Sequence, residues 1–166
     1  MRNVSRILPL LPGIAMLSGC NNAAQKSNGQ NDQKPNIIYI FADDLGIGDL
    51  SCYGATKVST PNIDRLAGQG VQFTNAYATS ATSTPSRFGL LTGMYPWRQK
   101  NTGIAPGNSE LIIDTACVTM ADMLKDAGYA TGAVGKWHLG LGPKGGTDFN
   151  KQITPNAQSI GFDYEF

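Results

Sequence analysis

Ser83-Thr84-Pro85-Ser86-Arg87-Phe88-Gly89-Leu90-Leu91-Thr92-Gly93 is the stretch around which the chain is organised. Its order predicts a helix, because Ser83 is a favoured N-cap, Pro85 suits the first turn and Gly93 is a common terminator. The Ser83 hydroxyl would then lie where backbone N–H groups and the helix dipole favour negative charge. Arg87 follows one turn later on roughly the same face. The alternative is a capped amphipathic helix without chemical function, because short motifs also arise by chance.

Length and charge narrow the classes of function. The 166 residues suffice for one ordinary domain with a hydrophobic core. Lys and Arg number 13 against 12 Asp and Glu, so the net charge favours neither nucleic acid nor an anionic membrane surface as a partner. The 20 glycines fall largely between apolar segments and predict tight loops, which often carry functional residues.

Residues 1–20 have the pattern of an export signal. Arg2 and Arg6 precede an apolar run over residues 7–17, which is too short for a membrane-spanning helix. The run leads into Leu17-Ser18-Gly19-Cys20, which resembles the lipobox of bacterial lipoproteins, whose cysteine is lipidated. An ordinary cleaved signal with a chance cysteine is the alternative.

Residues 21–34 are rich in Asn, Gln, Ser and Gly and predict a flexible polar tether. With lipidation at Cys20, we expect an exported bacterial lipoprotein, periplasmic or at the cell surface, that meets the membrane through its lipid anchor only. The folded part is expected to span residues 35–166. Of the remaining cysteines, Cys52 and Cys117 match no zinc-ligand spacing, and they are either a disulfide or, as we favour, two largely buried free thiols.

Residues 36–41 form a continuous apolar run, typical of a strand buried on both faces of a parallel sheet. Asp43 and Asp44 come directly after it, where ligands collect in open α/β sheets. Paired carboxylates repel each other unless a cation is supplied, and such oxygen ligands suit Ca²⁺ or Mg²⁺ better than zinc. A turn or helix cap is the alternative interpretation of this pair.

Further helices and strands are predicted along the chain. Residues 60–67 indicate a helix that ends near Gly70, and residues 71–77 alternate as a strand does. Residues 95–113 lack a clear period and predict a long surface loop, of the kind that often shapes a substrate pocket. A capping box at Thr119 opens another helix.

Gly128 is expected to close that helix, and residues 129–134 then predict a short strand. After it come Lys136 and His138, with both side chains on one side if the segment stays extended. Each has an ordinary alternative, since a lone histidine is usually structural and a lysine beside a tryptophan is usually a solvated surface residue. The segment from residue 141 to 166 is rich in Gly, Pro and Asn and shows no sign of a domain boundary at its end.

Each of the three predicted strands, over residues 36–41, 71–77 and 129–134, is followed by polar side chains. These are Asp43 and Asp44, then Ser83 and Arg87, then Lys136 and His138. Parallel strands would bring the three groups to one edge of a sheet. Together they would supply a divalent cation site, an activated oxygen, two fixed cations and one acid or base. That set fits transfer of an anionic oxo-group such as sulfuryl or phosphoryl.

The chain resembles the sulfatase family in four stretches that occur in the family's order: residues 35–46, 60–67, 83–93 and 135–140. The resemblance implies an α/β, alkaline-phosphatase-like fold, with a mixed, largely parallel sheet flanked by helices, truncated in this chain. It implies hydrolysis of sulfate esters with a bound divalent metal, for which Ca²⁺ is preferred over Mg²⁺. It also implies that Ser83 is oxidised to formylglycine, as in bacterial members matured by radical-type enzymes.

The resemblance also implies a role for each site residue. Asp43, Asp44 and the modified Ser83 bind the metal. Arg87 and Lys136 hold the formylglycine and the developing negative charge. His138 assists deprotonation of the aldehyde hydrate or the elimination step. One hydroxyl of the hydrate attacks sulfur and expels the alcohol, and the other lets sulfate leave as the aldehyde re-forms.

Family members are much longer than this chain and carry further metal ligands in their later parts, so residues 35–166 resemble the N-terminal part of the catalytic domain. We expect this piece alone to be inactive and poorly folded. A sulfated glycan is the preferred substrate, and an aryl-type or other small sulfate ester stays open. The alternatives in function are a phosphomonoester or phosphonate hydrolase of the same superfamily, and a non-catalytic glycan-binding surface lipoprotein.

Overall fold

The computed structural model describes residues 34–166 of the chain. The predicted export signal, the predicted lipidation site at Cys20 and the tether up to residue 33 lie outside the described residues. The chain divides into two units, Met1–Ile40 and Phe41–Phe166. The described residues of the first unit contain neither helix nor strand, so every element described below belongs to the second unit.

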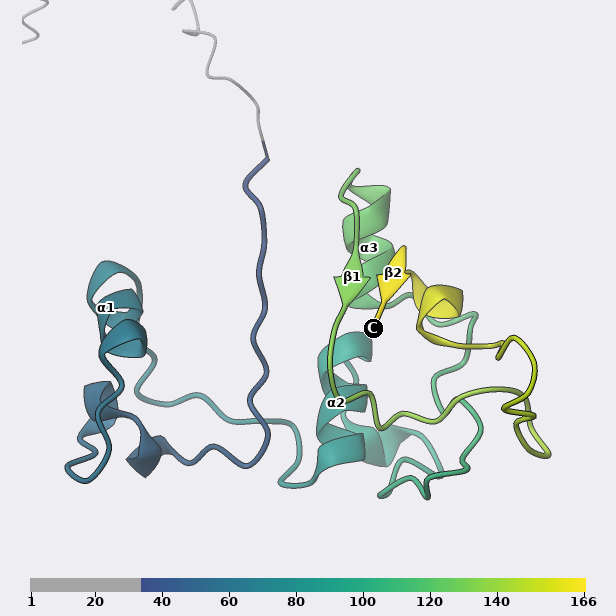
Figure 1. Cartoon of the computed structure of the whole chain (residues 1–166), viewed down its shortest axis with the longest axis horizontal. Coiled ribbons are helices and arrows are strands. Elements are labelled where there is room, and N and C mark those ends of the chain that lie inside the picture. Colours follow the sequence, from purple (N-terminus) through teal and green to yellow (C-terminus); the bar gives the residue numbers. More distant parts are fainter. Residues whose placement is uncertain (1–33) are drawn as a thin grey trace, which may run out of the picture. The chain divides into compact units, whose positions relative to one another are not determined.

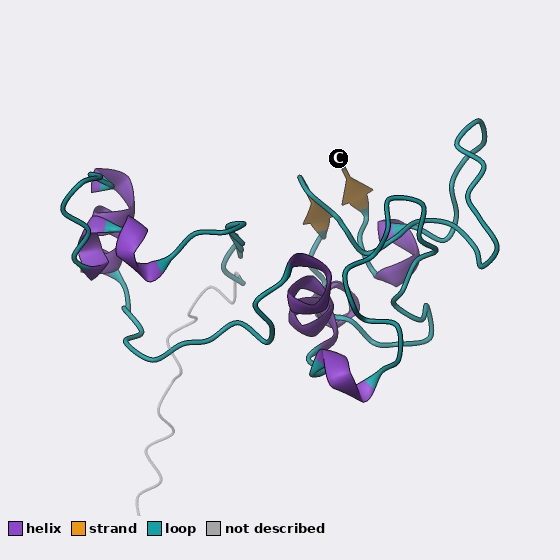
Figure 2. Ribbon diagram, turned by 90° about the horizontal axis from the view of Figure 1, so that it is seen from below, coloured by secondary structure: helices purple, strands orange, loops and turns teal. Residues whose placement is uncertain are grey.

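The second unit is built from short helices and one small sheet, with η marking 3₁₀-helices. In chain order the elements are η1 (Ile47–Asp49), η2 (Ser51–Tyr53), α1 (Pro61–Gln69), α2 (Ser83–Thr92), η3 (Pro96–Arg98), α3 (Met120–Asp126), β1 (Gly132–Ala133), η4 (Ala157–Ile160) and β2 (Tyr164–Glu165) (Figure 1). Between them the backbone runs mostly as loop, as Figure 2 shows, in keeping with the glycine content.

The predicted helix around Ser83 forms as α2 and ends at Gly93 as expected. Gly93 adopts a left-handed conformation, with φ 65°, and its N–H bonds the Gly89 carbonyl at 3.0 Å. The predicted N-cap was wrong by one residue, because Thr82 is the extended N-cap and Ser83 is the first helical residue. No helix N–H is bonded by the capping side chain, and the Ser83 hydroxyl is bonded by other side chains instead.

The hydrophobic core is formed where α2 meets segments distant in the sequence. Phe88 and Leu91 from α2 pack with the buried side chains of Ile113, Leu139 and Ile160. Each such buried side chain stabilises the fold by roughly 1.5–3 kcal/mol relative to exposure. The core therefore holds the loop before α3, the segment after β1 and η4 against the helix that begins with Ser83.

The small sheet is parallel, with Gly132 paired to Tyr164 and Ala133 to Glu165. Figure 1 shows β1 and β2 side by side. The strand predicted over residues 129–134 is thus confirmed only at Gly132 and Ala133, since a ladder extends no further than its partner strand.

α3 begins with the predicted capping box. The Thr119 hydroxyl accepts a hydrogen bond from the Asp122 N–H at 3.2 Å, and the Asp122 carboxylate accepts one from the Thr119 N–H at 2.9 Å. Gly128, the predicted terminator, follows the C-cap Ala127 and has φ 85°. The two hydrogen bonds of the capping box satisfy N–H groups that the start of a helix leaves without intrahelical partners.

α1 also forms where the sequence predicts a helix, and Asp64 ties it to the preceding turn. The Asp64 carboxylate accepts hydrogen bonds from the Ser51 hydroxyl at 2.6 Å, the Cys52 N–H at 2.9 Å and the Thr60 hydroxyl at 3.0 Å. The bond from the Ser51 hydroxyl is the main cause that lowers the pKa of Asp64 below its usual value.

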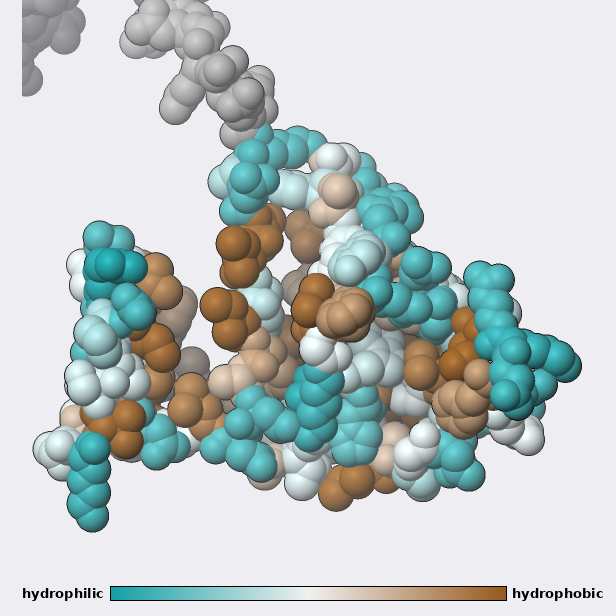
Figure 3. Space-filling view, in the orientation of Figure 1, coloured by the Kyte–Doolittle hydropathy of each residue, from teal (hydrophilic) through white to brown (hydrophobic). Residues whose placement is uncertain are grey.

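Two predicted strands do not form. Residues 36–41 contain no strand, and Ile38 and Ile40 are 85% and 82% exposed. Residues 71–77 likewise form no strand, and Tyr77 is 88% exposed. Figure 3 shows apolar side chains, in brown, on the surface. An apolar run indicates a tendency toward burial, whereas a strand needs a neighbouring strand, and β1 with β2 is the only such pair in the described part of the chain.

The long surface loop predicted over residues 95–113 forms only in part, because η3 lies near its start and Ile113 is buried in the core. The loop is tied to the segment after Lys136. Three backbone hydrogen bonds make the connection: Ile112 N–H to the Leu139 carbonyl at 3.0 Å, Leu141 N–H to the Ser109 carbonyl at 2.9 Å, and Leu111 N–H to the Gly142 carbonyl at 3.1 Å. Gly140 lies within this connection with φ 74°, and a Cβ there would collide with the Glu110 carbonyl oxygen. Glycine is therefore required at this position.

Candidate functional site

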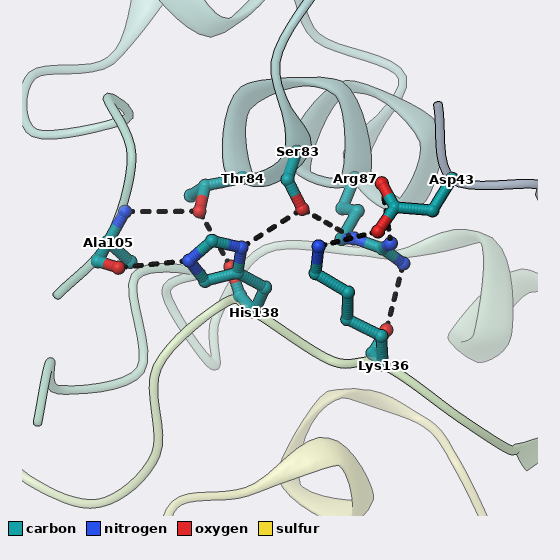
Figure 4. A network of polar contacts seen from close by, with 7 residues as sticks. All are labelled: Asp43, Ser83, Thr84, Arg87, Ala105, Lys136 and His138. Carbon is teal, nitrogen blue, oxygen red and sulfur yellow. Dashed lines mark hydrogen bonds and ion pairs between the residues drawn. The ribbon is translucent and has the colours of Figure 1, made fainter. Parts of the chain in front are cut away.

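Ser83 and Arg87 meet on one face of α2, as their spacing predicts. Arg87 Nε donates a hydrogen bond to Ser83 Oγ at 3.0 Å (Figure 4). The Arg87 side chain is only 12% exposed, and its Cζ lies 5.6 Å from the centroid of the Phe41 ring. Burial and the aromatic contact hold the guanidinium in place, so that it presents a fixed positive charge to the Ser83 oxygen.

Asp43 connects the two cations of the site. Lys136 Nζ lies 2.5 Å from Asp43 Oδ2, and Arg87 Nη2 lies 3.8 Å from Asp43 Oδ1. Arg87 Nη1 also donates a hydrogen bond to the backbone carbonyl of Lys136 at 2.8 Å. The hydrogen bond from Lys136 is the main cause that lowers the pKa of Asp43, and the charges of Lys136 and Arg87 lower it further. Asp43 is therefore a carboxylate at neutral pH.

His138 reaches Ser83 from a different segment. Its Nδ1 lies 3.0 Å from Ser83 Oγ, and its Nε2 lies 3.0 Å from the Ala105 carbonyl oxygen. A carbonyl oxygen can only accept, so Nε2 carries a proton, and in the neutral imidazole Nδ1 is the nitrogen that accepts. His138 can therefore take a proton from an O–H group at the Ser83 position.

The backbone of His138 departs from the extended conformation assumed for residues 136–138. His138 has φ 54°, a left-handed conformation that costs on the order of 1–2 kcal/mol for a residue with a Cβ. Its carbonyl accepts a hydrogen bond from the Thr84 hydroxyl at 2.8 Å. Such a conformation persists when the surrounding contacts determine it.

A pocket of about 300 Å³ opens beside Ser83. Asp43, Asp44, Ser83 and Arg87 are among its lining residues. Two carboxylates and a hydroxyl are hard oxygen donors that fit Ca²⁺ or Mg²⁺, although Ca²⁺ takes six to eight oxygens. The described residues contain no group of three or more His, Cys, Asp or Glu side chains able to hold a metal ion, so these donors alone make an incomplete coordination sphere.

The structure brings together the residues that the sequence singles out. Asp43, Ser83, Arg87, Lys136 and His138 are linked by direct contacts, and Asp44 lines the same pocket with φ 57°. The prediction that parallel strands bring these residues together was wrong, because the segments before Asp43 and before Ser83 are not strands. Side-chain hydrogen bonds and ion pairs, together with the core around α2, hold the groups together instead.

Three participants were missed at the sequence level. The Thr84 hydroxyl, the Ala105 backbone and the Lys136 carbonyl all bond residues of the site. Backbone groups carry no residue-specific signal, so two of the three could not be found from sequence. Thr84 had one usable signal, its place immediately after Ser83.

Other sequence expectations are met in part. Cys52 and Cys117 are free thiols as favoured, but both are half-buried rather than largely buried. The loop of residues 95–113 contributes most of the lining of a second, larger pocket of about 580 Å³, and Gly145 and Gly146 complete the lining. No helix in residues 34–166 has the length and apolar character needed to span a membrane.

The geometry around Ser83 suits reaction at an anionic centre. A guanidinium and an ammonium can stabilise negative charge that develops on a bound oxo-anion, and the imidazole can take or return a proton. A serine hydroxyl is a weak nucleophile without an activating base, and here the base in contact with it is His138.

Comparisons with known proteins agree on one family. A sequence model of the sulfatase family matches residues 35–164. Over 166 residues, the chain is 91% identical to an N-acetylgalactosamine-6-O-sulfatase of Bacteroides thetaiotaomicron, with 100% of this chain and 32% of that protein covered. The chain therefore spans about a third of the length of this relative.

Solved structures are similar as well. One, from work on the metabolism of multiple glycosaminoglycans by Bacteroides thetaiotaomicron, matches with a TM-score of 0.79 and 96% identity, covering 81% of this chain and 28% of that one. Another, in complex with its substrate D-glucosamine-2-N,6-O-disulfate, matches with a TM-score of 0.52 and 38% identity, covering 64% and 21%. The likeness confirms the predicted alkaline-phosphatase-like α/β fold class.

Proposed function

Because the chain belongs to the sulfatase family, we propose that it contains the part of a sulfuric ester hydrolase active site that supplies the nucleophile. The observation that supports this proposal best is that the Ser83 oxygen accepts a hydrogen bond from Arg87 and contacts His138 Nδ1. Residues 35–166 would form the N-terminal part of the catalytic domain, in keeping with the 32% of the relative's length that the whole chain covers.

We propose that Ser83 is the precursor of the nucleophile and is oxidised to formylglycine by a radical-type maturating enzyme. One hydroxyl of the aldehyde hydrate would attack sulfur as the S–O bond to the substrate alcohol breaks and the alcohol leaves. Loss of the proton from the second hydroxyl would then break the C–O bond to the sulfate and re-form the aldehyde, which water hydrates again. His138 Nδ1 lies where it can take the proton from such a hydroxyl, because Nε2 is already committed to the Ala105 carbonyl. Arg87 holds the oxygen and Lys136 adds positive charge near it.

Asp43, Asp44 and the modified Ser83 are the proposed metal ligands of this chain. A bound Ca²⁺ supplies positive charge to a sulfate oxygen, and Mg²⁺ is the second choice. Lys136 Nζ lies 2.5 Å from Asp43 Oδ2, so its positive charge offsets the negative charge of this proposed ligand. Further oxygens from water, substrate or other residues would complete the coordination sphere.

The proposed substrate is a glycan that carries a 6-O-sulfate on N-acetylgalactosamine. The support is the 91% identity to a sulfatase named for that activity, together with a solved relative bound to a sulfated glucosamine. A phosphomonoester or phosphonate hydrolase stays as the second candidate, since it would share the paired aspartates. Retention of Asp43, Ser83, Arg87, Lys136 and His138 in mutual contact argues against a non-catalytic glycan-binding role.

The test uses the full-length protein that carries this chain, produced with and without the maturating enzyme. We expect hydrolysis of an aryl sulfate and of N-acetylgalactosamine 6-sulfate only when mass spectrometry finds Ser83 as the aldehyde. Ser83→Ala is the control that cannot be converted. Full activity with unmodified Ser83, or faster hydrolysis of an aryl phosphate than of the sulfate, would overturn the proposal.

Export and lipid anchoring through Cys20 are proposed on the signal and lipobox pattern alone. Fractionation of cells that make the full-length protein should find it with membranes, and Cys20→Ala should release it. A cleaved, unlipidated protein in the soluble fraction would instead indicate an ordinary export signal.

A further inference from the structure

Thr84 lies beside the reacting residue but points away from it into the protein. Its side chain is fully buried, with 0% exposure. Its hydroxyl donates a hydrogen bond to the His138 carbonyl at 2.8 Å and accepts one from the Ala105 N–H at 3.1 Å. Both hydrogen-bonding roles of this hydroxyl are therefore used, one on each of two segments distant in the sequence.

The same two segments also meet through the His138 ring. Its Nε2 donates to the Ala105 carbonyl, while its Nδ1 faces Ser83 Oγ. A closed ring of contacts thus runs from the Thr84 hydroxyl to the His138 backbone, through the imidazole to Ala105, and back to Thr84 (Figure 4). Thr84 binds the backbone of both partners, and the ring orientation of His138 follows from where those backbones lie.

The left-handed conformation of His138 needs contacts that hold it in place, and this ring of contacts provides them. With φ 54°, the backbone of His138 is held in a region that residues with a Cβ seldom occupy. The bond from Thr84 to the His138 carbonyl fixes the peptide at that point. Without it, the segment can relax and move the imidazole relative to Ser83.

We propose that Thr84 is a positioning residue, which uses one hydroxyl to hold the His138 carbonyl and the Ala105 N–H so that His138 Nδ1 faces the Ser83 position. This inference rests on the proposed function, in which His138 exchanges a proton with the oxygen at that position. It assigns the second residue of the Ser83 motif a role in the chemistry that does not require contact with the substrate.

The test distinguishes a positioning role of Thr84 from a purely structural role, because the two roles predict different outcomes. Thr84→Val keeps the shape of the side chain and removes both hydrogen bonds. Thr84→Ser keeps the hydroxyl and removes the methyl group. Thr131→Val is the matched control, because Thr131 is a buried threonine whose hydroxyl bonds the Gly161 carbonyl at 2.7 Å, away from the site.

The variants are made in the full-length protein with its maturating enzyme, and rates are divided by the fraction of Ser83 found as aldehyde. Thr84→Val is expected to lower kcat on the order of 10²-fold with little change in KM, because a small displacement of a proton-transfer group has effects of that size. Thr84→Ser should keep kcat near that of the wild type. Thr131→Val should lower the thermal midpoint and leave kcat unchanged.

A double-mutant cycle with His138→Ala gives the decisive readout. If Thr84 acts through His138, Thr84→Val lowers kcat no further once His138 is replaced. An equal loss in both backgrounds, or a wild-type kcat in converted Thr84→Val, overturns the inference.

Should Thr84→Val fail to fold or to be converted, Thr84→Cys replaces it, because a thiol is the weaker hydrogen-bonding group. The serine variant must then exceed the cysteine variant in kcat at similar KM, and equal values contradict the inference. An absence of aldehyde and of sulfate hydrolysis in the wild type would mark failure of the proposed function itself, which is a distinct result.

Discussion

Arg87 Nε donates a hydrogen bond to Ser83 Oγ at 3.0 Å from one helical turn further along α2. The same guanidinium donates through Nη1 to the Lys136 carbonyl at 2.8 Å. One side chain therefore fixes both the oxygen at which reaction is proposed and the segment that carries Lys136. A planar group with several donors in fixed directions can do this, whereas an ammonium on a flexible chain cannot.

The first prediction concerns that geometry. Arg87→Lys keeps the positive charge but cannot reproduce both hydrogen bonds, so we expect kcat of the full-length protein to fall on the order of 10²-fold. Rates for an aryl sulfate, divided by the fraction of Ser83 converted to aldehyde, provide the measurement. Arg98→Lys, at an exposed arginine of η3, should behave as the wild type. A fully active Arg87→Lys would show that charge alone is sufficient.

The second prediction concerns Gly140. Alanine at this position would adopt a left-handed conformation and its Cβ would collide with the Glu110 carbonyl oxygen. The conformation alone costs about 1–2 kcal/mol, and the clash adds to it. Denaturant unfolding of the full-length protein should therefore show a loss of at least this size. Gly103→Ala is the control, since a Cβ there meets nothing within 4 Å, and equal stability of the two variants would contradict the structure.

The third prediction concerns acid. The pKa of Asp64 is lowered below 3.8 in the folded protein, chiefly by the bond from the Ser51 hydroxyl. The stability that this carboxylate contributes is therefore fully present above the unfolded pKa and is lost as pH falls through the lower folded pKa. Hydrogen-exchange protection of the Cys52 N–H, which donates to Asp64 at 2.9 Å, should fall in that acidic range. In Asp64→Asn the protection should be lower and should not change with pH there, and a wild-type profile in this variant would refute the assignment.

The fourth prediction concerns the chain of residues 35–166 produced alone. Side chains such as Ile38, Val71 and Phe166 are 85%, 79% and 86% exposed, and apolar surface of this kind favours association over a stable monomer. We expect no cooperative thermal transition, strong binding of a hydrophobic dye, no sulfate hydrolysis and no saturable Ca²⁺ binding. Cooperative unfolding together with saturable Ca²⁺ binding would show that the segment is an independent unit.

Local patterns predicted the helices well, because the signals that start and stop a helix act within one turn. The Thr119 capping box and the glycine terminator at Gly93 both form as the sequence indicates. The N-cap of α2 was misplaced by one residue, since both Thr82 and Ser83 are acceptable at that position and local sequence does not distinguish them.

Strands were predicted less well for a physical reason. Residues 36–41 and 71–77 have the composition of strands, but composition cannot supply the neighbouring backbone that completes a ladder. β1 forms only where β2 lies beside it, at Gly132 and Ala133. β2 itself was not anticipated, because two residues are too short for a periodic pattern.

By itself the sequence determined which residues could do the chemistry: Asp43, Asp44, Ser83, Arg87, Lys136 and His138 all stand in motifs whose spacing is readable along the chain. Only the tertiary structure decided how they meet. His138 reaches Ser83 across 55 residues, and the contacts that set its direction run through the Ala105 backbone and the buried Thr84 hydroxyl. Backbone carbonyls are the same in every residue, so their partners are chosen by packing around α2 and leave no pattern in the sequence.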